Sequence, residues 1–275
     1  MVGNMNGSER SDCTEIKKKQ FLGDRTLRSY VIPAGVREIG DWAFSGCKEL
    51  SRIEVPATLE RIGRDAFLGC DKLEEVRISN MEQAAAGLLA LAFRFFPEAA
   101  EILRALLSGD ENWVRYWDIA CERYLSLPET EGFRPFWAGG EEDYEEDESK
   151  LVEHCRGKRL IKAEMAVKRL LAMDGKGAAI AEMVSNGEGE TRCETRQIYE
   201  AHLRENDMSL EYLKTVKQQP ALAVRIYEQA GALTDEKIRK VLEELPEEAV
   251  ELRAALLKSL QGGGTEGLKL EEWML

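Results

Sequence analysis

Residues 27–49, LRSYVIPAGVREIGDWAFSGCKE, run directly into residues 50–72, LSRIEVPATLERIGRDAFLGCDK, and both follow one 23-residue pattern. A third copy starts with Leu73, Val76 and Ile78, while Ile16, Phe21 and Gly23 fit the same frame at the front. The sequence therefore predicts a repeat over residues 16–79 with incomplete first and last coils. Nine positions are identical in the two full copies: Leu27/Leu50, Pro33/Pro56, Ala34/Ala57, Ile39/Ile62, Gly40/Gly63, Ala43/Ala66, Phe44/Phe67, Gly46/Gly69 and Cys47/Cys70.

The pattern in each copy predicts a short strand followed by turns. Leu27, Tyr30 and Ile32 have the spacing of a strand whose alternate residues point inward. Pro33 follows, and proline ends a strand because it cannot donate to the ladder. The later Ala-Phe-x-Gly-Cys stretch predicts a tight turn whose phenylalanine, Phe44 or Phe67, fills the coil centre. A single coil cannot bury its apolar edge, so we expect the coils to stack.

Stacking in register makes positions 23 apart neighbours, at about 5 Å. Charges at such positions repeatedly have opposite signs, which favours a single register. These pairs are Lys18/Asp41, Arg37/Glu60, Glu38/Arg61, Asp41/Arg64, Lys48/Asp71, Glu49/Lys72, Arg52/Glu75 and Glu54/Arg77.

One strand face is the candidate protein-binding face. Its charges are expected to neutralise one another, so it is either a solvated surface or a small concave surface that binds a ligand. The outward residues are Ser29, Val31, Arg52, Glu54, Glu75 and Arg77.

The repeat resembles a known family. The pattern I-P-x-x-V-x-x-I-G-x-x-A-F-x-x-C-x-x-L, read from Ile32 to Leu50, is similar to the BspA-like leucine-rich repeats of bacterial proteins. The resemblance covers about a quarter of the chain. It implies binding of proteins through the repeats, and several exported members of that family act as adhesins.

Helical periodicity replaces the strand pattern after Ser79, so the chain is expected to be an α+β protein. We predict a flexible tail over 1–15, the leucine-rich-repeat solenoid of about three coils over 16–79, and a helical domain over 80–261. The helical domain is expected to be a bundle or an α-solenoid. A glycine-rich hinge with an apolar tail follows over 262–275.

Two helical segments carry specific expectations. The first, with Leu88 to Phe96, is apolar nearly all round and is predicted to cap the last coil while joining the helical core. A stripe formed by Trp113, Trp117, Ala120 and Tyr124 is predicted to be core. The acidic run EEDYEEDE over 141–148 is interpreted as a solvated loop, since it lacks the spacing of a calcium loop.

Composition excludes several classes of partner. The formal net charge of −13 argues against nucleic acid and against anionic membranes, because both need a basic surface. The N-terminus has no apolar signal sequence, and no run of about 18 apolar residues occurs. The six cysteines include no CxxC pair, so we expect free thiols in a reduced, cytoplasmic protein.

The sequence offers no catalytic, cofactor-binding or metal-binding set. Its two histidines, His154 and His202, are read as structural or surface residues. Three hypotheses stay open: a non-enzymatic scaffold that binds a protein partner, an exported adhesin-like ligand-binding protein, and an enzyme whose acids come from scattered helices. The partner and the oligomeric state are not predicted.

Overall fold

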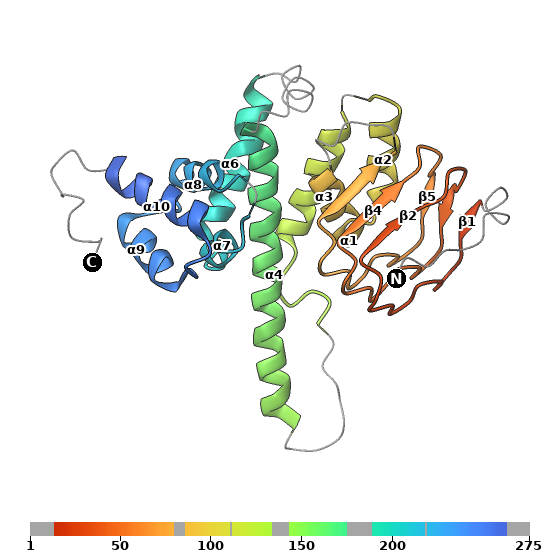
Figure 1. Ribbon diagram of the computed structural model, residues 1–275, viewed down its shortest axis with the longest axis horizontal. Helices are drawn as coiled ribbons and strands as arrows, with labels where there is room; N and C mark the ends of the chain where they lie inside the picture. The colour runs from red at the N-terminus through yellow and green to blue at the C-terminus, as the bar shows by residue number, and fades with distance from the viewer. Residues whose placement is uncertain are drawn as a thin grey trace. The chain divides into compact units, whose positions relative to one another are not determined.

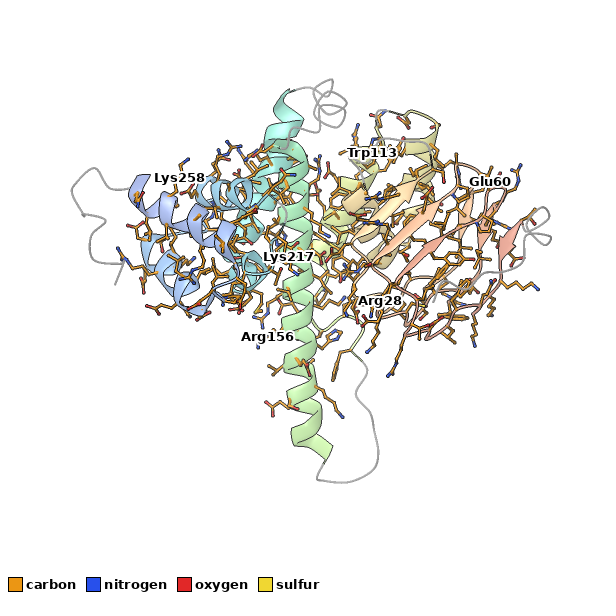
Figure 2. All side chains as sticks on the ribbon, viewed as in Figure 1. Arg28, Glu60, Trp113, Arg156, Lys217 and Lys258 are labelled. Carbon is orange, nitrogen blue, oxygen red and sulfur yellow. The ribbon has the colours of Figure 1, made fainter. Side chains whose placement is uncertain are left out.

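The computed structural model describes residues 14–79, 86–110, 112–133, 143–174, 189–217 and 219–262. These residues fall into two compact units, the first reaching Leu127 and the second starting at Pro128. Figure 1 shows that the strands all belong to the first unit, together with α1, α2 and α3.

The repeats form two parallel three-stranded sheets. One has the order β1 (Glu15–Ile16), β3 (Glu38–Ile39) and β5 (Arg61–Ile62), and the other has the order β2 (Ser29–Val31), β4 (Arg52–Val55) and β6 (Glu75–Ile78). In all four strand pairings the paired residues are 23 apart, as in Ser29 with Arg52 and Ile53 with Val76. The predicted register is therefore confirmed in both sheets.

A ladder of phenylalanine rings runs through the centre of the repeats. The ring centroids of Phe21 and Phe44 lie 5.0 Å apart, and those of Phe44 and Phe67 lie 5.2 Å apart with the rings almost parallel. Phe44 and Phe67 are fully buried, as their repeat position predicted. Phe93 of α1 continues the ladder at 5.2 Å from Phe67.

Different contacts explain the glycine and the cysteine that recur in both full copies of the repeat. A Cβ atom on Gly63 would lie 2.4 Å from the backbone nitrogen of Asp41, so only glycine allows the coils to approach this closely. The thiols of Cys47 and Cys70 donate hydrogen bonds to the carbonyl oxygens of Phe21 and Phe44, at 3.0 and 3.1 Å. Burial raises the pKa of Cys70 to about 12, so this thiol stays protonated and serves as a packing residue, not as a nucleophile.

Five of the eight predicted charge pairs form ion pairs across the register. Lys18 lies 4.0 Å from Asp41, Lys72 lies 2.7 Å from Glu49, and Arg52 lies 2.7 Å from Glu75. Arg37 pairs with Glu60, and Arg61 pairs with Glu38. Each exposed pair contributes little, so their main effect is to disfavour a shifted register.

Three helices complete the first unit: α1 (Ala86–Phe95), α2 (Ala99–Leu107) and α3 (Trp113–Ser126). As predicted, α1 is nearly all buried and packs on β6, the last strand of the repeats. The indole of Trp117 in α3 donates to the carbonyl oxygen of Leu88 at 2.9 Å, which holds the far side of α1. The stripe on α3 is buried at Trp113, Trp117, Ala120 and Tyr124, which confirms it as core.

The compact unit extends beyond the predicted domain border after Ser79. The border of the unit lies at Leu127, because α1 and α2 pack on the repeats and α3 packs on α1 and α2. Sequence periodicity marks where strands give way to helices, but packing decides which helices share a core with the strands.

Among its described residues, the second unit contains helices and no strands. Its helices are α4 (Asp143–Asp174), α6 (Gly189–Glu205), α7 (Ser209–Leu213), α8 (Pro220–Gln229), α9 (Asp235–Glu244) and α10 (Val250–Gly262). The long helix α4 packs against α6, α7 and α8, and α10 packs against α8 and α9.

The expected loop over 141–148 is wrong for most of its length, since α4 already begins at Asp143. A helix N-terminus favours acidic residues in its first turns, so an acidic run can start a helix as well as fill a loop. Residues 1–13, 134–142, 175–188 and 263–275 lie outside the described residues, and so do the predicted N-terminal tail and nearly all of the C-terminal hinge and tail.

Phe67→Ala tests the phenylalanine ladder. Removing a fully buried ring between two neighbouring rings leaves a cavity, and we expect a loss of about 3–5 kcal/mol in the free energy of unfolding. Urea unfolding followed by circular dichroism measures this loss. The adjacent Leu68 is 54% exposed, so Leu68→Ala is the matched control and should change stability by only about 0.5 kcal/mol. Equal effects of the two substitutions would contradict the ladder.

Candidate binding face

The candidate binding face is the outward side of the sheet formed by β2, β4 and β6. Inward side chains of this sheet, such as Ile53 and Val76, are completely buried. Because side chains alternate along a strand, their neighbours point away from the core. The structure thereby brings together all six predicted residues on one face: Ser29, Val31, Arg52, Glu54, Glu75 and Arg77.

Glu75 is the centre of the charges on this face. Its Oε2 atom accepts hydrogen bonds from Nε of Arg52 at 2.7 Å and from Nε of Arg77 at 3.0 Å. Burial disfavours the charged carboxylate, but the two arginines outweigh this effect and lower the pKa of Glu75. The carboxylate is therefore charged at neutral pH and holds both guanidinium groups in place.

The predicted pair Glu54/Arg77 does not form, although the two residues are register partners. Arg77 instead bonds to Glu75, two positions earlier on its own strand, because both side chains lie on the same side of β6. The hydroxyl of Ser79 donates to Oε1 of Glu54 at 2.8 Å, which gives this carboxylate a different partner. Register alone fixes which residues are adjacent, not which of several neighbours a long side chain selects.

Exposure changes along the face. The Val31 side chain on β2 is 64% exposed, and Ser29 beside it is exposed too. The side chains of Glu75 and Arg77 on β6 are only 26% and 30% exposed. The face thus consists of an open apolar position at one side and an ordered ionic cluster at the other.

The two histidines lie in the second unit. His154 Nε2 lies 3.1 Å from the carbonyl oxygen of Glu131, and its ring packs against Phe133. His202 is half-buried, not at the surface as expected, and burial together with the nearby charge of Lys162 lowers its pKa.

A pocket of about 300 Å³ in the second unit is lined by an ionic cluster. Arg196 of α6 donates to Asp174 at 2.7 and 3.1 Å, to Glu200 at 2.6 Å and to Gln229 of α8 at 2.9 Å. Sequence reasoning missed this cluster, because only Arg196 and Glu200 have a recognisable helical spacing. The cluster ties α4, α6 and α8 together, which is a structural role.

The described residues contain neither a metal-binding cluster nor a membrane-spanning helix. The described residues contain no group of three or more histidine, cysteine or acidic residues placed to hold a metal ion. Within the same ranges, no helix combines the length and the apolar character needed to cross a bilayer.

Comparison with known proteins gives a family match for the repeats. Residues 11–87 match the family model described as BspA type leucine rich repeat region, in six copies. This segment is therefore a BspA-type leucine-rich-repeat region, and the helices follow it. No curated protein matches the chain, and no solved structure does.

Glu75→Gln tests the ionic cluster on the face. A pKa lowered on folding means that the carboxylate stabilises the fold above its ordinary value near 4.5 and that this contribution is lost as pH falls through the folded-state pKa. We expect the variant to be less stable by about 0.5–1 kcal/mol at about pH 7 and equal to the parent protein at about pH 2.5. Urea unfolding at both pH values measures this, and a difference that persists in acid would contradict the cluster.

Proposed function

We propose that the protein is a non-enzymatic scaffold that binds a protein partner through the candidate binding face of its repeat solenoid. The observation that carries this proposal is the combination of the open Val31 with the fixed Arg52–Glu75–Arg77 cluster on one sheet face. The family to which this region belongs gives independent support, since leucine-rich repeats commonly mediate protein interactions.

The geometry of the face suits a protein surface better than a small molecule. Parallel strands present its side chains in two rows, Ser29–Arg52–Glu75 and Val31–Glu54–Arg77. Guanidinium groups held in place before binding lose little conformational freedom when a partner contacts them. An apolar side chain beside ordered arginine is the composition from which interface hot spots are built.

The helices supply support rather than chemistry in this proposal. In the first unit α1 covers the last repeat, and Arg104 of α2 donates to the carbonyl oxygen of Glu60 at 3.1 Å. In the second unit the charged side chains around Arg196 bind one another.

A cytoplasmic location is part of this proposal. Cell fractionation distinguishes a cytoplasmic scaffold from an exported adhesin.

Affinity capture from the native cell tests the face. Retained proteins are identified by mass spectrometry for the parent protein, for the double variant Val31→Asp/Arg52→Glu and for the control Leu68→Asp. Both substituted regions are exposed, so folding should persist, which circular dichroism checks. We expect one partner whose retention falls at least about tenfold with the double variant and is unchanged with the control. Equal retention by all three proteins would exclude this face as the binding site.

A further inference from the structure

Three cations surround the ring of Trp42, in the turn that follows β3. The Nζ atoms of Lys18 and Lys19 lie 4.9 and 5.5 Å from the ring centroid, and the guanidinium carbon of Arg64 lies 5.2 Å from it. All three cationic residues are exposed, and Trp42 is half-buried. Distances of this size are typical of cation–π contacts, so the four side chains form one cluster, here called the Trp42 patch.

The Trp42 patch brings three cations together around one ring. Nearby register positions instead pair a cation with a carboxylate, as in Arg61 with Glu38 and Arg37 with Glu60. In the patch, Asp41 lies 4.0 Å from Lys18 and accepts a hydrogen bond from the backbone nitrogen of Arg64. Among the described residues, Lys19 and the Arg64 guanidinium form no ion pair, so the patch carries an excess of positive charge.

The backbone at Trp42 makes this residue type unexpected. Lys19, Trp42 and Asp65 occupy one repeat position, and their φ angles are 61°, 54° and 53°. The repeat turn therefore requires a left-handed conformation, which glycine, asparagine and aspartate adopt more easily than tryptophan. A bulky aromatic residue at such a position costs backbone energy. In return, the Trp42 side chain provides a ring that contacts three cations, which a small residue could not do.

We propose that the Trp42 patch is a docking surface for an acidic peptide segment of a protein partner. Carboxylates of the segment would pair with Lys18, Lys19 and Arg64, whose contact with the indole ring holds them close together. The turn with Trp42 follows β3, which belongs to the sheet of β1, β3 and β5 and not to the sheet of β2, β4 and β6. The Trp42 patch is therefore a surface in addition to the candidate binding face. Charge complementarity favours a short acidic segment over nucleic acid, because three cations are few for a polyphosphate and the whole chain carries −13.

Fluorescence anisotropy with the full chain tests this proposal. The probe is a fluorescein-labelled 12-residue peptide of glutamate and aspartate, and its control is a peptide of glutamine and asparagine of the same length. The variants are Trp42→Asn, Arg64→Gln and Lys19→Gln, with Arg61→Gln as the matched control. Arg61 lies three residues before Arg64 and is also exposed, but it is already paired with Glu38.

We expect the acidic peptide to bind, with an affinity that falls as salt rises, and the amide peptide not to bind. Trp42→Asn should weaken binding roughly tenfold or more, each of Arg64→Gln and Lys19→Gln should weaken it several-fold, and Arg61→Gln should leave it unchanged. Asparagine suits the left-handed backbone, and the two exposed cations can be replaced without touching the core, so loss of folding does not mimic loss of binding. Equal binding by Arg64→Gln and the parent protein, equal binding of both peptides, or tighter binding of a DNA duplex than of the acidic peptide would overturn the proposal.

Discussion

The contact between phenylalanine rings 23 residues apart is the constraint on which the first unit depends. Phe21, Phe44 and Phe67 stack at about 5 Å, which is also the spacing of neighbouring strands. A shift of the register by one residue would separate the rings and bring side chains against the glycine positions where the coils almost touch. The glycines at 40 and 63 and the thiols at 47 and 70 are consequences of this close spacing.

The same register determines the surface. Equivalent positions of successive coils become neighbours, so cations and carboxylates 23 residues apart form ion pairs across the register. Two departures from this rule are the sites that we assign to binding. Val31 is an exposed apolar residue on the face that carries the ionic cluster, and the ring of Trp42 lies beside Lys19.

Much of the first unit could be predicted from sequence because its period is short and nearly exact. The spacing predicted the strands β2, β4 and β6, the buried Phe44 and Phe67, and five ion pairs, but it did not predict the second sheet of β1, β3 and β5. The partner of Arg77 could not be predicted from the register, because it bonds to Glu75 on its own strand while Glu54 accepts a hydrogen bond from Ser79. The contact of Lys18, Lys19 and Arg64 with Trp42 was missed, because the 23-residue spacing was read for opposite charges and not for cations beside an aromatic ring.

The helical part was less predictable for a physical reason. Its helices have no common period, so sequence indicates where a helix forms but not which helix it contacts. The start of α4 at Asp143 shows that an acidic run at a helix N-terminus looks the same in sequence as a solvated loop. The Arg196 cluster joins residues from α4, α6 and α8, and only its i,i+4 pair can be read locally.

We infer that the repeats are stable only with α1, which continues the phenylalanine ladder at Phe93. Thermal unfolding of residues 1–127 and of residues 1–80, followed by circular dichroism and sedimentation, tests this dependence. We expect one cooperative transition for the longer chain, and an unfolded or aggregating shorter chain, since its last coil exposes an apolar edge. A soluble, monomeric 1–80 chain that unfolds cooperatively would contradict it.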